Sequence, residues 1–194
     1  MENQFEEIFR QIKSDVQNID YTNAGIDPLY YASKEAKILI IGQAPGKKAQ
    51  DTRIVWNDPS GQRLRKWMGV SDEEFYHSKK IAIMPMDFYF PGKGKSGDLP
   101  PRKKFAAKWH PRLLELMPQV ELIILVGSYA VREYLNLKTK DKLTDVVKNY
   151  QEYLPRYFPL VHPSPRNQIW LKKNPWFEKD VVPKLQSEVK RLMK

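Results

Sequence analysis

The 194-residue sequence contains no cysteine. This absence excludes disulfide bonds, thiolate zinc sites and cysteine-ligated iron–sulfur clusters, and it predicts a cytoplasmic protein without a metal or another cofactor. Long apolar runs are also missing, because the longest, 38–41 and 122–126, are strand-sized and far shorter than a membrane span. We recognise neither a signal segment nor a lipidation motif. We therefore expect a monomer that does not contact membranes.

Positive charge is abundant, with a formal net charge of +10, but it is unevenly distributed. Seven lysines and arginines lie between Lys93 and Arg112, and Asp98 is the one acidic residue among them. Basic side chains beside aromatic ones, here Phe105 and Trp109, suit the phosphate backbone of a nucleic acid. A lysine-rich surface that only keeps the protein in solution is an equally good interpretation of the charge alone.

Four short apolar runs have the length and composition of buried strands: 37–41, 81–84, 122–126 and 157–161. Helical patterns separate them, which favours a parallel sheet covered on both faces. We predict an α/β fold, a three-layer α/β/α sandwich with a central, mainly parallel four-stranded sheet. Residues 1–194 are expected to form a single domain, with an N-terminal helix over about 3–18 and a core over about 37–194.

Several helix boundaries are predicted from local signals. Ser60 is placed to cap a short helix that Gly69 ends, and Ser71 with Glu74 has the spacing of a capping box for the next helix. Pro111 is expected to start a new helix inside the helical stretch 102–117. A final helix is predicted over 176–193.

Unusual loops directly follow the predicted strands. The first strand runs into Gly42-Gln43-Ala44-Pro45-Gly46, which is neither a dinucleotide fingerprint nor a P-loop, and the fourth runs into His162-Pro163-Ser164-Pro165-Arg166-Asn167. Ligands bind at the carboxyl ends of strands in parallel sheets, so these loops are expected to form one site. The other histidines, His77 and His110, are interpreted as a surface residue and a structural residue.

These two motifs resemble the uracil-DNA glycosylase superfamily over about residues 37–170. The segment 42–46 is similar to the Gly-Glu-x-Pro-Gly motif of its iron–sulfur branch, and Trp56 and Ser60-Gly61 stand where that branch has an aromatic residue and Ser-Gly. The segment 162–167 is similar to the second motif of the single-strand-selective monofunctional branch. The resemblance implies a DNA-repair enzyme that flips a deaminated base, such as uracil, hypoxanthine or xanthine, and hydrolyses its N-glycosidic bond.

The resemblance also implies individual roles. His162 would donate a hydrogen bond to the base, Trp56 would stack on it, and Gly42, Ala44, Pro45 and Gly46 would line its pocket. Pro163, Ser164, Pro165 and Arg166 would enter the DNA duplex, with Arg166 as the wedge. Lys103 and Lys104 are expected to contact phosphates.

Two positions depart from the family pattern. Relatives often carry a carboxylate in the first motif, where this chain has Gln43 and Ala44, and Gln43 can orient water but cannot accept a proton. The asparagine that reads the base in relatives falls near Met84, and Asp87 is the candidate to replace it. These departures keep two alternatives open: a DNA-damage-binding protein without catalysis, and an enzyme that acts on a free nucleoside or nucleotide.

Overall fold

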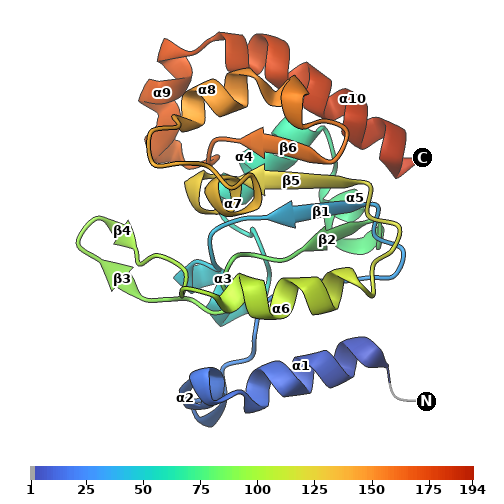
Figure 1. Cartoon of the computed structure of the whole chain (residues 1–194), viewed down its shortest axis with the longest axis vertical. Coiled ribbons are helices and arrows are strands. Elements are labelled where there is room, and N and C mark those ends of the chain that lie inside the picture. The colour runs from blue at the N-terminus through green and yellow to red at the C-terminus, as the bar shows by residue number, and fades with distance from the viewer. Residues whose placement is uncertain (1–2) are drawn as a thin grey trace.

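Four short strands form the central sheet of the structure, a computed structural model that describes residues 3–194 (Figure 1). They are β1 (Ile38–Ile41), β2 (Ile81–Ile83), β5 (Leu122–Val126) and β6 (Tyr157–Leu160). Their order across the sheet is β2-β1-β5-β6, and every neighbouring pair is parallel. The predicted mainly parallel four-stranded sheet is confirmed.

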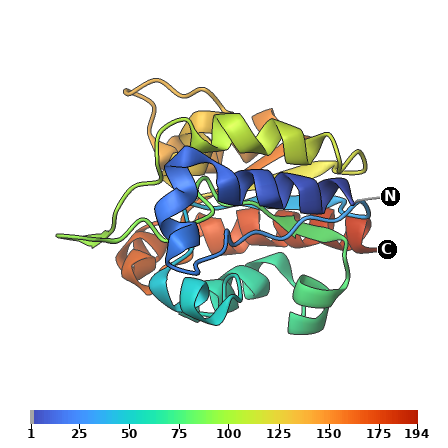
Figure 2. The same ribbon diagram turned by 90° about the horizontal axis from the view of Figure 1, so that it is seen from below.

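Side chains of β1 alternate between the two faces of the sheet, as the two-residue period of a strand requires. Ile38 and Ile40 are in the core cluster that includes apolar residues of α4 (Pro59–Met68) and α10 (Val182–Met193). Leu39 and Ile41 are in the cluster that includes residues of α1 (Gln4–Ser14), α6 (Phe105–Leu114) and α7 (Ser128–Tyr134). Figure 2 shows α6 on one side of the sheet and α4 with α5 (Asp72–His77) on the other, which confirms the three-layer architecture.

The remaining elements are short. The helices are α2 (Ile19–Asn23), α3 (Lys47–Thr52), α8 (Leu143–Lys148) and α9 (Gln168–Lys173), and a π-helical turn over Phe177–Val181 precedes α10. Two two-residue strands, β3 (Lys93–Gly94) and β4 (Gly97–Asp98), make an antiparallel hairpin that projects from the body of the protein (Figures 1 and 2). Within residues 3–194, no helix is long and apolar enough to cross a membrane.

Local signals located some helix ends correctly. The capping box of Ser71 and Glu74 is present at the start of α5. Gly69 ends α4 in the left-handed conformation with φ of 68°, as its lack of a side chain permits. The prediction that Ser60 caps α4 is wrong, because Asp58 takes that position and its side chain accepts a hydrogen bond from the backbone N–H of Gly61.

Two other helix predictions need correction. The N-terminal helix ends at Ser14 rather than near residue 18, and Val16, beyond its end, is 83% exposed. Pro111 lies inside α6 rather than at the start of a new helix. A proline there removes one backbone hydrogen bond. Burial of Trp109 and Leu113 on the same helix stabilises α6 despite that loss.

Candidate functional site

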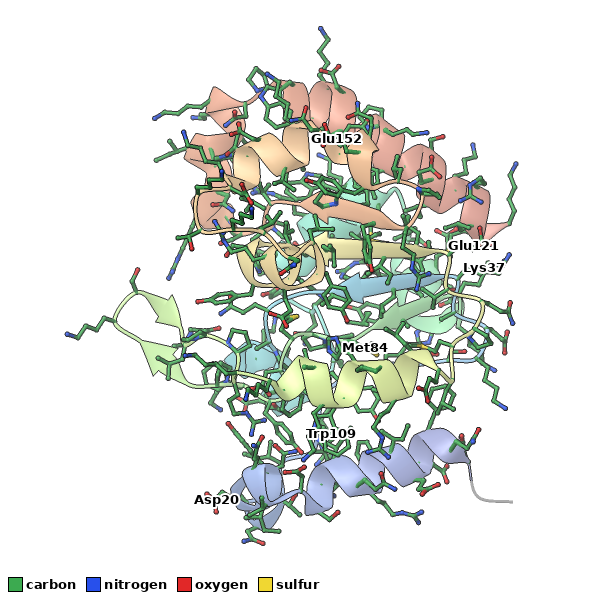
Figure 3. The ribbon with its side chains drawn as sticks, in the orientation of Figure 1. Asp20, Lys37, Met84, Trp109, Glu121 and Glu152 are labelled. Carbon is green, nitrogen blue, oxygen red and sulfur yellow. The ribbon has the colours of Figure 1, made fainter. Side chains whose placement is uncertain are left out.

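Lys37 and Glu121 directly precede β1 and β5, so they mark the amino ends of these strands, at the right of Figure 3. The carboxyl ends of the strands lie at the opposite edge of the sheet. A cavity of about 360 Å³ occupies this edge. Its walls come from residues 42–46, from Trp56 and Asp58, from hairpin residues 96–98, and from the segment that begins at His162. The loops that follow β1, β2 and β6 therefore meet in one site, as the parallel sheet predicts.

Most of the predicted site residues line this cavity: Gly42, Gln43, Ala44, Pro45, Gly46, Trp56, His162, Ser164 and Arg166. The structure does not bring Asp87, Pro163, Pro165, Lys103 or Lys104 to its wall. Met84, labelled in Figure 3, is fully buried in the core and does not line the cavity, although its neighbours Ile83 and Pro85 do.

The loop 42–46 is fixed by the segment that follows β2. The carbonyls of Gly42 and Gln43 accept hydrogen bonds from the backbone N–H groups of Met86 and Asp87, at 2.8 and 3.2 Å. The side-chain amide of Gln43 donates to the carbonyl of Leu99, at 3.1 Å. These bonds attach the first motif to the chain on both sides of the β3–β4 hairpin, so the cavity wall is a braced loop.

Trp56 has an uncommon backbone conformation, with φ of +54°. Its carbonyl oxygen accepts hydrogen bonds from the guanidinium of Arg65, at 3.0 Å, and from the hydroxyl of Tyr76, at 3.2 Å. Gly61 lies directly against this carbonyl, because a Cβ at position 61 would be 1.7 Å from the oxygen. A bulky residue with positive φ persists only where its surroundings hold it, and such residues cluster at functional sites.

Arg65 is the centre of that support. Its side chain is buried, forms an ion pair with Asp72 at 2.6 Å, and lies over the rings of Phe75 and Tyr76, each 5.3 Å from its Cζ. A buried guanidinium with hydrogen bonds, an ion pair and two ring contacts is held in place and cannot easily reorient. Arg65 thereby fixes the Trp56 backbone at the cavity wall.

His162 begins the segment after β6, and its surroundings determine which ring nitrogen carries the proton. The backbone N–H of Ser164 donates to Nδ1 at 3.1 Å, so the neutral imidazole carries its hydrogen on Nε2. Burial lowers the pKa of His162, while Asp58 and Asp98 act in the opposite direction. The ring of Trp56 lies 5.7 Å away, between centroids, and Gly127 leaves space behind the imidazole. His162 is thus a neutral hydrogen-bond donor at the cavity.

Two carboxylates at the cavity were not identified from the sequence. Asp58 and Asp98 both line it, Asp58 as the N-cap of α4 and Asp98 at the end of the hairpin. Asp98 forms an ion pair with Lys93 at 2.7 Å. The Asp58-Pro59 pair is a typical start of a helix and could have identified Asp58 as the N-cap, but it carries no signal for a place at the cavity.

Asp87 does not line the cavity, and its contacts give it a structural role. It is fully buried, and its two oxygens accept hydrogen bonds from Arg102 at 2.7 and 2.9 Å. Arg102 also donates to the carbonyl of Gln17 and the side chain of Asn18. The pair joins the loop after β2 to the N-terminal helical segment, and this engagement leaves Asp87 unsuited to read a base.

Part of the predicted basic cluster is paired within the protein. Three of its seven members form ion pairs, Lys93 with Asp98, Arg102 with Asp87 and Lys108 with Asp15, and Arg112 donates a hydrogen bond to the uncharged amide of Gln11. Phe105 and Trp109 are buried, and Figure 3 places Trp109 between α6 and α1. The expected aromatic surface beside the bases is therefore absent from this region. The side chains of Lys95, Lys103 and Lys104 are exposed and have no hydrogen-bond or ion-pair partner among residues 3–194.

Arg166 lies at the mouth of the cavity, exposed, in a short 3-10 turn that Ser164 caps. Its guanidinium has no ion-pair partner in the described chain, and it approaches the hairpin so closely that a Cβ on Gly97 would be 3.0 Å from it. Pro163 is buried below the turn, and Pro165 is exposed within it. Arg63 and Asn167 brace the segment through the carbonyls of Ser164 and His162.

No group of three or more histidine and acidic side chains within residues 3–194 is arranged to hold a metal ion. The third histidine candidate, His110, has the structural role expected of it. It is buried, its ring nitrogens contact the hydroxyl of Tyr134 and the carbonyl of Pro85, and burial lowers its pKa to about 4.

Comparison with known proteins gave a family match and structural matches. The model of the uracil DNA glycosylase superfamily matches residues 29–186, a range that includes every segment of the cavity wall. A solution NMR structure of a "putative Uracil DNA glycosylase" from Methanosarcina acetivorans is 14% identical in sequence, with a TM-score of 0.45. That match covers 81% of this chain and 93% of the other.

Proposed function

Because the chain belongs to the uracil DNA glycosylase superfamily, we propose that it is a monofunctional DNA glycosylase that removes a deaminated base from DNA without a cofactor. Its substrate base would be uracil, hypoxanthine or xanthine. The observation that carries the proposal is His162, a neutral imidazole at the cavity whose Nε2 hydrogen has no partner among residues 3–194.

Cleavage of an N-glycosidic bond leaves negative charge on the departing base. A donor that is already oriented stabilises that charge in the transition state more than it stabilises the neutral bound base, so it lowers the barrier. The N–H of Ser164 orients the imidazole of His162, and burial keeps it neutral. Removal of one such donor typically costs about 100-fold to 1,000-fold in rate.

A base that leaves the DNA stack must recover a few kcal/mol of lost stacking and pairing. Trp56 supplies an aromatic surface at the cavity wall, held by Arg65 and Tyr76. Stacking on an aromatic side chain contributes about 1–3 kcal/mol per base. Arg166 is exposed, lines the same cavity and has no ion pair in the described chain, which supports its proposed role of filling the vacated position in the duplex.

The proposal is tested with labelled oligonucleotides that carry uracil, hypoxanthine or xanthine, followed by alkaline cleavage of abasic sites. We expect wild-type protein to cut at least one of them and His162→Ala to be at least about 100-fold slower. His77→Ala is the matched control, because His77 is an exposed histidine at the end of α5, outside the cavity. Equal rates for the two variants would refute the role of His162.

A duplex specificity test addresses Arg166 separately. Arg166→Ala should slow cleavage in duplex DNA, where a wedge is needed, and leave single-stranded DNA almost unaffected. Equal effects on both substrates would contradict the wedge role.

One observation favours a second candidate, a DNA-damage-binding protein that has kept the base pocket. The first motif carries Gln43 and Ala44, and neither side chain can accept a proton from water. In that case wild-type protein would bind damaged oligonucleotides more tightly than undamaged ones and would cleave none of them. The same panel therefore separates the two candidates.

A further inference from the structure

We infer that Asp58 is the carboxylate that activates the hydrolytic water, in place of the first-motif side chain that this chain lacks. The inference rests on the proposed glycosylase function and adds a residue to its mechanism. Asp58 lies on a different element from the first motif, at the N-terminus of α4, yet both line the same cavity.

The geometry of the helix start orients this carboxylate. Oδ1 of Asp58 accepts a hydrogen bond from the backbone N–H of Gly61 at 2.8 Å, and Pro59 occupies the first turn of the helix. The other oxygen, Oδ2, has no hydrogen-bond partner in the described part of the chain. A capping bond therefore fixes the carboxylate and leaves one oxygen available to a water molecule in the cavity.

Asp58 is also the better placed of the two cavity carboxylates. Asp98 forms an ion pair with Lys93, whereas Asp58 has no ion-pair partner among residues 3–194. Both carboxylates line the same cavity as His162, the donor to the base. Gln43 cannot replace them as a base, because its amide donates to the carbonyl of Leu99 and does not accept protons at neutral pH.

The step that follows balances without a further reactant. The bond between C1′ of the sugar and the base nitrogen breaks, and its electron pair leaves with the base, where the N–H of His162 stabilises it. The oxygen of water forms a bond to C1′, and the water proton passes to the Asp58 carboxylate. Transfer of that proton to the departed base regenerates the site. A general base of this kind contributes about 100-fold to 10,000-fold in rate.

Two substitutions separate the chemical role from the cap. Asp58→Asn and Asp58→Ser both keep a side-chain acceptor for the helix start, so α4 is expected to stay folded. Asp51→Asn is the control, because Asp51 is an exposed aspartate of α3 that pairs with Lys47 and does not line this cavity. Asp98→Asn tests the competing carboxylate.

Single-turnover cleavage of the oligonucleotide that wild type cuts best is measured, and binding is measured with DNA that carries a stable abasic-site analogue. We expect both Asp58 variants to be about 100-fold slower or more, with unchanged thermal midpoints and abasic-DNA affinity. Asp51→Asn should match wild type.

Three results would overturn the inference. Asp58 variants within five-fold of wild type would show that no proton passes to this residue, while the glycosylase function would stand. A loss in Asp98→Asn equal to or larger than that in Asp58→Asn would assign the effect to the other carboxylate or to the total charge of the cavity. A wild type that cleaves no oligonucleotide would refute the proposed function itself, and this role with it.

Discussion

Substitution of Gly61 by alanine tests whether the backbone of Trp56 is the fixed platform of the pocket. A Cβ at position 61 would be 1.7 Å from the carbonyl oxygen of Trp56 and 2.5 Å from its carbonyl carbon. Ordinary contacts to a Cβ are at least 3.4 Å. The Trp56 carbonyl must therefore move by more than an ångström, away from Arg65 and Tyr76, which donate to it.

The expected cost follows from these contacts. Forcing one methyl group into a packed site costs about 1–3 kcal/mol. Weakening a hydrogen bond from a charged donor, here Arg65, costs about 1.5–3 kcal/mol more. We expect the free energy of unfolding to fall by about 2.5–6 kcal/mol, which lowers the thermal midpoint of a protein of this size by roughly 10 °C.

Two other glycines of the site provide matched comparisons. At Gly42 a Cβ would be 2.8 Å from Cζ2 of the Trp56 ring, and a ring can tilt more easily than a backbone can shift. At Gly46 the nearest atom would be Oδ2 of Asp98 at 3.9 Å, which is an ordinary contact, and φ is −72°. Stability should therefore fall in the order Gly46→Ala, Gly42→Ala, Gly61→Ala.

Thermal unfolding and base cleavage are measured on all three variants. Gly42→Ala should keep most of its stability and lose activity, because displacing the end of the ring changes the surface that the base meets; a misplacement of about 1 Å can cost 100-fold. A Gly61→Ala variant with the thermal midpoint and cleavage rate of wild type would show that the strained Trp56 conformation is not needed for the site.

Three further predictions concern groups outside the cavity. Replacing both Lys103 and Lys104 by alanine should weaken binding to every DNA sequence. In fluorescence anisotropy titrations, the slope of log affinity against log salt should decrease by about one unit per lost phosphate contact, and an unchanged slope would show that these lysines do not contact DNA. Asp87→Asn should lower the free energy of unfolding by about 3 kcal/mol, because Arg102 loses its buried charged partner. The preference among bases should stay unchanged, and an altered preference in the cleavage panel would show that Asp87 reaches the base. The pKa of His110 is about 4 in the fold, below its ordinary 6.5, so the unfolded chain binds a proton first and the free energy of unfolding decreases as pH falls from about 6.5 towards 4. This decrease, about 3 kcal/mol by pH 4, should be missing when denaturant titrations are repeated on His110→Gln. Equal pH dependence of the two proteins would contradict the prediction.

Features decided within a few residues could be predicted from the sequence. The capping box of Ser71 and Glu74 needs only the spacing of two side chains, and the left-handed end at Gly69 needs only the absence of a Cβ. The sheet was predictable because alternate residues of 38–41 must be buried on opposite faces. The order of the site loops followed from the parallel connection of those strands.

Features that depend on partners distant in sequence were not predictable. Asp87 was the candidate base reader because the family resemblance places the base-reading asparagine near Met84, but its partner Arg102 is brought to it by the loop that contains the hairpin. Trp109 was predicted to lie on a nucleic-acid surface, but it is buried between α6 and α1. Asp58 became a cavity residue only through the placement of α4 against the first motif, which no local spacing encodes.

The way the cavity is assembled also determines what a loss of base binding would indicate about the fold. Its walls come from loops separated by about 120 residues of chain, from Gly42 to His162, and β1 and β5 must pair with their neighbours before those loops meet. Residues 42–98 supply most of the wall, but His162 and Arg166 come from the segment that follows β6. Base binding is therefore a property of the whole cooperative unit, and under denaturant it should disappear in the same transition as the sheet.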